Sequence, residues 1–192
     1  MDQDKELYKE FLEGNKDALS EIIEKYRAEL IFFAQKFVKD YHSAEDVSQE
    51  VFIYLMKHKE IYDFKYSFRA YLYTIAKSRA LNYIKVKRKH LFIEDDDVTL
   101  ASDMHDVEEE IFRKEQNVAV RRAIKKLKKD YQIVLYLVEY KGSTYEETAV
   151  IMKKSISQVK ALVHNAKKRL KVFLEEEGIK GVEHDEINGR LH

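Results

Sequence analysis

The chain has 192 residues, which is enough for one domain of ordinary size or for two small ones. Its 35 Lys and Arg residues balance its 35 Asp and Glu residues, so the overall charge argues against a uniformly basic nucleic-acid binder. Cysteine is absent, which excludes disulfides, thiolate metal sites and cysteine nucleophiles, and the absence of proline with only five glycines favours long helices.

Apolar residues of the first half recur at steps of three and four, which predicts three helices. The first spans residues 16–38, and the second begins at Ser43, where Asp46 three residues later resembles a capping box. The third spans residues 67–89, and residues 59–66 connect it to the second. The predicted inward residues are Leu19, Ile22, Tyr26, Leu30, Phe33 and Phe37, then Val47, Val51 and Leu55, then Phe68, Leu72, Ile75 and Ala76.

An acidic segment follows these helices. Residues 94–110 contain nine acidic residues and no Lys or Arg. Like-charge repulsion and the few apolar groups predict an extended, flexible linker that ends as a helix begins near Val107.

Helical spacing returns in the second half and predicts a helix-turn-helix. One helix covers residues 120–127, and an apolar segment over residues 131–140 precedes a turn. Thr144 with Glu147 forms a second predicted capping box that opens a short helix. After a brief break, a last helix begins at Ser157. Its apolar stripe consists of Val159, Leu162, Val163, Ala166 and Leu170. An ordinary helical hairpin has a similar pattern, so it remains the alternative.

Positive charge is concentrated on two of the predicted helices. Residues 65–90 contain eight Lys or Arg residues and no acid, and residues 153–171 contain seven and no acid. Cationic helix faces neutralise phosphates and release counterions, so the two blocks indicate nucleic-acid binding. A solvated helix face is the alternative for either block taken alone.

The last predicted helix carries polar residues away from its apolar stripe, where a recognition helix contacts the major groove. The residues placed to read base edges are Lys160, Ala161, His164 and Asn165. The residues placed to contact phosphates are Ser157, Gln158, Lys167 and Lys168.

Aromatic residues flank the first basic block. Tyr62, Phe64 and Tyr66 lie in the connection between two predicted helices, where packing alone explains them poorly. Bases of single-stranded DNA stack on aromatic rings while cations track the backbone, so this connection is a candidate site for unpaired bases. A core position is the alternative for these rings, and we prefer it for Phe68.

The second predicted helix has an acidic outward face. Its residues are Glu45, Asp46, Gln49 and Glu50. Because such a face repels phosphates, it should point to water or to a basic protein partner.

Several of these motifs occur in one characteristic order. They are AEDVSQEVF at residues 44–52, FRAYLYTIA at 68–76, TYEETA at 144–149 and AKKRL at 166–170. In this combination the chain resembles the bacterial RNA polymerase sigma factors of the extracytoplasmic-function (ECF) group, over roughly residues 11–174.

The resemblance implies an all-α protein of two small helical domains joined by an acidic flexible linker, the second containing the helix-turn-helix. The implied divisions are residues 1–90 for sigma region 2, 91–110 for the linker, 111–176 for sigma region 4 and 177–192 for a flexible tail. It also implies an alternative sigma factor that binds core RNA polymerase and directs promoter-specific transcription initiation. An anti-sigma factor, often membrane-anchored, commonly holds such proteins inactive.

The resemblance assigns residues to these partners. Asp46, Gln49 and Glu50 match positions that dock on the clamp helices of the polymerase, and the final helix matches the reader of the −35 duplex. The linker would thread the catalytic and RNA-exit channel. The positions implied for the melted −10 element are Tyr62, Phe64, Lys65, Tyr66, Arg69, Ser78, Arg79, Asn82 and Lys85.

The chain departs from the family pattern at a few positions. Tyr71 stands where tryptophan often precedes the leucine of the melting helix, and Lys128 stands where proline usually follows Leu127. Residues 77–85 lack the usual Arg-Asn and Asp…Arg pairs, and residues 153–154 are Lys-Lys where glycine is common. These changes affect the detailed −10 preference and local turn geometry, while both basic helices remain.

Other classes of function are distinguishable. A stand-alone helix-turn-helix regulator explains the last helix but leaves the other basic block and the acidic linker without a role. A helical protein-interaction module would show no salt-dependent DNA affinity. We expect no enzyme, metal site or cofactor, because the seven histidines lack ligand spacing and no phosphate loop or nucleophile motif occurs.

The longest apolar run, residues 133–138, is far shorter than the roughly 20 residues that span a membrane. The N-terminus also lacks a signal-peptide pattern. We therefore expect a soluble, cytoplasmic protein with no direct membrane insertion.

Overall fold

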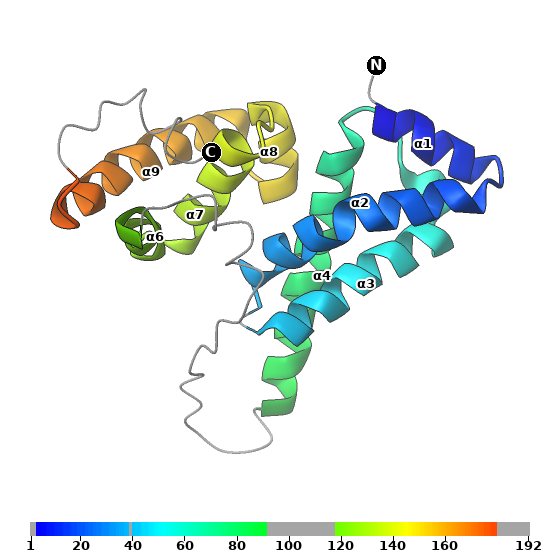
Figure 1. Ribbon diagram of the computed structural model, residues 1–192, viewed down its shortest axis with the longest axis horizontal. Helices are drawn as coiled ribbons and strands as arrows, with labels where there is room; N and C mark the ends of the chain where they lie inside the picture. Colours follow the sequence, from blue (N-terminus) through cyan, green and yellow to red (C-terminus); the bar gives the residue numbers. More distant parts are fainter. Residues whose placement is uncertain (1–2, 39, 92–117, 180–192) are drawn as a thin grey trace. The chain divides into compact units, whose positions relative to one another are not determined.

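The computed structural model describes residues 3–38, 40–91 and 118–179 (Figure 1). Within these ranges all regular secondary structure is helical, and the chain divides into two compact units, Met1–Glu108 and Glu109–His192. The predicted all-α, two-domain class is therefore confirmed. None of the described helices is long and apolar enough to cross a membrane. The acidic segment and the helix expected near Val107 lie outside the described residues.

Unit 1 is built around α2 (Lys16–Gln35), which packs against α1 (Gln3–Leu12), α3 (Tyr41–Lys57) and α4 (Phe68–Leu91). A short 3-10 turn, η1 (Lys59–Ile61), follows α3, and α2 and α3 lie side by side (Figure 1). Every inward residue predicted for the first half is buried. The periodicity therefore located the core of this unit, although α1 was not among the predicted helices.

The start of α3 differs from the prediction. The N-cap is Asp40, whose carboxylate accepts hydrogen bonds from the Ser43 amide at 2.8 Å and the Ser43 hydroxyl at 2.7 Å. Partial burial would raise the pKa of the Asp40 carboxyl, but these hydrogen bonds and the Lys87 ammonium outweigh it and lower the pKa. The predicted capping box of Ser43 with Asp46 is therefore wrong, because the helix begins two residues earlier, at Tyr41.

Unit 2 contains α6 (Val118–Lys125), α7 (Lys129–Leu135), a π-helical turn η2 (Tyr136–Tyr140), α8 (Tyr145–Met152) and α9 (Ile156–Glu176). The long α9 packs against α6, α7 and α8 and supplies much of the core. The buried residues of α9 are Val159, Val163, Ala166, Leu170 and Leu174. Leu162, predicted as part of this stripe, is only half-buried.

Capping boxes begin both helices of the helix-turn-helix. Thr144 and Glu147 form the predicted box at the start of α8. A second box, which was not predicted, joins Ser155 and Gln158 and starts α9 at Ile156. Both boxes satisfy amide groups that a helix N-terminus otherwise leaves without partners, so they define where α8 and α9 begin.

The turn between α8 and α9 contains a lysine in the left-handed backbone region. Lys153 has φ 55° and ψ 49° and caps α8, its amide donating to the Ala149 and Val150 carbonyls. A side chain with a Cβ atom adopts this conformation at a cost of roughly 1–2 kcal/mol. The unusual lysine at this position therefore stores conformational strain that glycine would not.

Replacing Lys153 with glycine should stabilise unit 2 by about 1 kcal/mol, because glycine adopts the left-handed conformation freely and loses only part of this gain in the unfolded chain. Chemical denaturation followed by circular dichroism measures the change. Lys153→Ala removes the same charge but keeps the Cβ atom, so it should give no gain. Equal stabilisation by alanine and glycine would contradict the conformational explanation.

Candidate functional site

One exposed face of α3 carries the three predicted docking residues. Asp46, Gln49 and Glu50 are all exposed, and Asp46 lies three and four residues before the other two, the spacing of neighbours on a helix surface. Glu45 differs, because its Oε1 accepts a hydrogen bond from Arg27 of α2 at 2.5 Å and its side chain is 23% exposed. The acidic face that a partner can reach is therefore formed by Asp46 and Glu50.

The same face continues into apolar residues that were not predicted as part of it. Ile53 is 43% exposed and Met56 is 45% exposed, one and two turns beyond Gln49. We call Asp46, Gln49, Glu50, Ile53 and Met56 the α3 surface. Apolar side chains gain free energy when a partner buries them, and the adjacent acids favour a basic partner. The helical spacing of these apolar residues was the signal that could have found them.

Residues 59–67, which we call the connection, begin with η1, lead to α4 and include a buried tyrosine. Tyr62 is 5% exposed, and its ring stacks on Tyr71 with centroids 4.7 Å apart. Its hydroxyl donates a hydrogen bond to the Tyr66 carbonyl at 2.7 Å. The structure therefore contradicts the expected base-facing position of Tyr62, because its ring belongs to the core.

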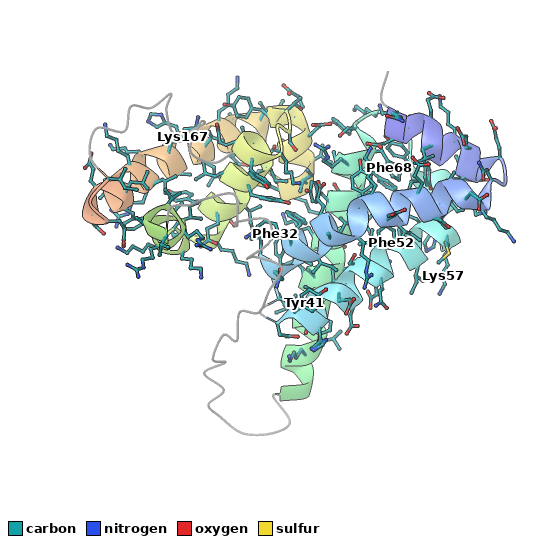
Figure 2. The ribbon with its side chains drawn as sticks, in the orientation of Figure 1. Phe32, Tyr41, Phe52, Lys57, Phe68 and Lys167 are labelled. Atoms are coloured by element: carbon teal, nitrogen blue, oxygen red, sulfur yellow. The ribbon has the colours of Figure 1, made fainter. Side chains whose placement is uncertain are left out.

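The surface of the connection combines aromatic and cationic side chains. Lys65 is exposed, Phe64 and Tyr66 are half-buried, and the Lys65 ammonium lies 5.4 Å from the centroid of the Tyr66 ring. Phe64 has φ 60°, in the left-handed region, and the Lys65 amide donates to the Asp63 carboxylate at 3.1 Å. Phe68 is fully buried, as expected, and lies where α1, α2 and α4 meet (Figure 2).

Three further −10 candidates form an exposed stripe along α4. Ser78, Asn82 and Lys85 are exposed at spacings of four and three residues. This spacing places one hydroxyl, one amide and one cation on the same side of the helix, where they can contact a nucleic-acid backbone together.

The two arginines predicted for the −10 element make contacts within unit 1. Arg69 Nε lies 3.5 Å from Glu29 Oε1, with its side chain 39% exposed. Arg79 is half-buried, and its guanidinium lies 4.7 Å from the Tyr54 ring centroid. Arg69 thus joins α4 to α2, and Arg79 joins α4 to α3. Both arginines therefore have a packing role in unit 1 in addition to their positive charge.

The exposed face of α9 brings together most of the residues predicted for duplex DNA. We call this set the α9 surface: Ser157, Gln158, Lys160, Ala161, His164, Asn165 and Lys168, all of which are exposed. The Gln158 side-chain oxygen accepts from the Ser155 amide at 2.8 Å, so this side chain also caps the helix. The four residues predicted to read base edges are therefore exposed, as their position away from the apolar stripe predicts.

Lys167 lies apart from the α9 surface. Its Nζ is 2.9 Å from Glu139 Oε1 of η2, and the two side chains are only 14% and 7% exposed. Figure 2 labels Lys167 on α9. The predicted phosphate contact of Lys167 is therefore not supported, because its ammonium is largely buried against a carboxylate of its own unit.

The charges and rings on these surfaces suit binding to other macromolecules. Among the described side chains, no group of three or more His, Asp or Glu residues could hold a metal ion. The two cationic faces suit the phosphate backbone, and the aromatic connection suits unpaired bases. The α3 surface suits a partner that combines cations with apolar groups.

Family models match both halves of the chain. The model of sigma-70 region 2 matches residues 22–90, and that of sigma-70 region 4 matches residues 117–170. The chain is 26% identical over 180 residues to RNA polymerase sigma-H factor of Pseudomonas aeruginosa, covering 88% of this chain and 92% of that protein. It is 27% identical over 159 residues to RNA polymerase sigma factor YlaC of Bacillus subtilis, covering 82% and 92%. With the ECF RNA polymerase sigma factor SigM of Bacillus subtilis it shares 26% identity over 161 residues, covering 81% and 94%.

Solved structures share the fold. The sigma factor RpoE, solved with the anti-sigma factor NepR from Bartonella quintana, matches 81% of this chain and 96% of its own, with a TM-score of 0.61 and 17% identity. CnrH, solved with the cytosolic domain of CnrY, matches 90% of this chain and 97% of its own, with a TM-score of 0.62 and 19% identity.

Proposed function

Because the chain belongs to the sigma-70 family and is a sigma factor of the ECF group, we propose that it binds core RNA polymerase and directs it to promoters. One observation carries this proposal. The region 2 match contains the α3 surface and the stripe on α4, and the region 4 match contains the whole α9 surface. A polymerase-binding face and two separate DNA-binding faces are what promoter recognition requires.

In unit 1 we propose separate roles for α3 and for the connection with α4. The α3 surface docks on a basic helical part of the polymerase through Asp46 and Glu50. The connection and α4 hold the melted −10 strand, with bases against exposed parts of Phe64 and Tyr66 and phosphates near Lys65 and Lys85. The polymerase supplies the chemistry of RNA synthesis, so we assign the chain no reaction of its own and place it in the cytoplasm with the polymerase.

In unit 2 we propose that α9 reads the −35 duplex. Lys160 and Asn165 offer donors suited to guanine and to adenine edges, and Lys168 offers a cation to the phosphates. Lys160 Nζ also lies 5.9 Å from the Tyr145 ring centroid, so this side chain is positioned beside α8. In this proposal the N-terminus of α9, with its capping box, faces the DNA.

Two substitutions on α9 should separate base reading from phosphate contact. Lys160→Ala should relax the preference at one −35 position, because each direct base contact contributes about 1–3 kcal/mol of discrimination. Lys168→Ala should weaken binding to all sequences and lower the salt slope by about one. Holoenzyme binding to single-base variants of the promoter at several salt concentrations measures both effects. Identical behaviour of the two variants would refute this division of roles.

An anti-sigma factor is a second proposed partner. Two solved structures of the same fold were each determined with a bound partner, in one case the anti-sigma factor NepR. An inhibitor that covers the α3 surface would exclude the polymerase, and the apolar Ile53 and Met56 provide area for it to bury. We propose that such a factor, soluble or membrane-anchored, competes with core polymerase for this face.

A binding experiment distinguishes the sigma function from that of a stand-alone regulator. The full chain is titrated onto promoter duplexes with and without core polymerase. The proposed function predicts weak binding alone and sequence-specific binding in the presence of core. Tight, specific binding of a palindromic duplex without core would instead identify a stand-alone helix-turn-helix regulator.

A further inference from the structure

Helix α1 contacts the connection at two points, Lys59 and Phe64, although it precedes the part of the chain matched by the region 2 model. The Tyr8 hydroxyl donates a hydrogen bond to the Lys59 carbonyl at 2.8 Å. The Lys5 ammonium donates to the Phe64 carbonyl, also at 2.8 Å. Two side chains one turn apart on α1 therefore bind backbone oxygens five residues apart in the connection.

The aromatic core adds packing to these hydrogen bonds. Tyr8 is fully buried, and its ring centroid lies 4.8 Å from that of Phe68 and 5.7 Å from that of Tyr62. Burial raises the pKa of Tyr8 to about 12, so its hydroxyl remains a protonated donor at neutral pH. The Lys59 ammonium lies 4.6 Å from the Phe11 ring centroid. These contacts hold α1 against the connection along much of its length.

Lys5 contacts Phe64, whose backbone conformation needs stabilising contacts. Phe64 has φ 60°, and a non-glycine residue in this region persists only when its surroundings favour it. Hydrogen bonds inside the connection, from Tyr62 to Tyr66 and from Lys65 to Asp63, supply part of this support. The Lys5 ammonium supplies a charge-assisted contact at Phe64 itself, from outside the connection.

Helix α1 is itself fixed to α2. The Asp4 carboxylate accepts a hydrogen bond from the Tyr26 hydroxyl at 2.5 Å and pairs with the Lys25 ammonium. Asp4 and Lys5 are adjacent in sequence, so one turn of α1 is bound both to the central helix of unit 1 and to the connection. The arrangement gives the connection a rigid support that does not depend on DNA.

We propose that α1 positions the connection for capture of the melted strand, with Lys5 and Tyr8 as positioning residues that act through the backbone at Phe64 and Lys59. This inference rests on the proposed function and extends it to a helix outside the matched region. Neither residue needs to touch DNA. By fixing these two carbonyls, they set the direction in which Phe64, Lys65 and Tyr66 face an unpaired strand.

The test compares Lys5→Met, Lys5→Arg and Tyr8→Phe with the wild-type protein. Lys5→Met keeps the length of the aliphatic chain but removes the donor, and Tyr8→Phe removes only the hydroxyl. Lys16→Met, an exposed lysine at the start of α2, is the matched control for loss of charge. Hydrogen exchange of residues 59–67 measures directly how strongly the backbone amides of the connection are protected. Permanganate reactivity of unpaired thymines measures promoter opening, and core affinity is measured in parallel.

Lys5→Met should speed exchange in the connection and lower open-complex formation about tenfold, with core affinity changed less than about twofold. Tyr8→Phe should show a smaller effect of the same kind, Lys5→Arg should restore most of the loss, and Lys16→Met should match the wild type. The proposal is overturned if hydrogen exchange of the connection and promoter opening stay at the wild-type level in both Lys5→Met and Tyr8→Phe. A parallel loss of core affinity and opening would also overturn it, since that is the signature of general destabilisation.

The promoter is one that the wild-type protein selects from a random-sequence library with core polymerase. If the wild type selects and opens no promoter, the proposed function fails. The exchange measurement still decides whether Lys5 holds the connection, because it requires neither DNA nor polymerase. Failure of the positioning inference and failure of the proposed function are therefore distinguishable.

Discussion

Reversing two charges on the α3 surface, by Asp46→Lys with Glu50→Lys, should lower affinity for core polymerase about a hundredfold or more. Each reversal replaces an attraction to a basic partner by a repulsion, and close charge pairs across protein interfaces couple by about 1.5–7 kcal/mol. Both residues are exposed, so the substitutions should leave the fold of unit 1 intact.

Competition with the wild-type protein for labelled core polymerase measures this loss. The matched control is Glu21→Lys with Glu24→Lys, which reverses two exposed acids at similar spacing on α2. The control should retain core affinity within a few fold. Equal losses in both double variants would show that overall charge, and not the α3 surface, determines binding.

Removing the buried cation of α9, by Lys167→Met, should destabilise unit 2 by about 2–3 kcal/mol. The Lys167 ammonium lies 2.9 Å from a Glu139 carboxylate whose side chain is 7% exposed, so the substitution leaves a largely buried charge without this cation. Replacing both members, by Glu139→Leu with Lys167→Met, should recover most of the loss, since two apolar groups need no counter-charge.

Hydrogen exchange of the α9 amides, measured at increasing urea concentrations, reports the free energy of unfolding of unit 2 separately from that of unit 1. Lys168→Met removes an exposed charge from the next residue and should change stability by no more than about 0.5 kcal/mol. If Lys167→Met and Lys168→Met have equal effects on stability, Lys167 does not have the structural role that its position indicates.

The helices and most of the core were predictable because they depend on local periodicity. The stripes of α2, α3 and α4 needed only spacing at three and four residues, and the box of Thr144 with Glu147 needed only two residue types at a fixed distance. The start of α3 was harder to place. Asp40 and Ser43 are both good N-cap residues, and only the backbone conformation decides between them.

The two site predictions that the structure does not support, for Lys167 and Tyr62, concern contacts between residues distant in sequence. Lys167 has the spacing of an outward cation, but a carboxylate 28 residues earlier, Glu139 of η2, binds it in the structure. Tyr62 has the local context of an exposed aromatic residue, yet rings from α1 and α4 surround it. The contact of Lys5 with Phe64 joins residues 59 apart. No local pattern reports such pairs, because the fold alone brings them together.

Run-off transcription with core polymerase from a random promoter library tests the central claim most directly. Adding this chain to core polymerase should yield transcripts from a restricted set of sequences that share a −35 and a −10 element. The double reversal at Asp46 and Glu50 should abolish them. Transcription that is indifferent to the presence of the chain, together with no binding to core polymerase, would contradict the proposed function.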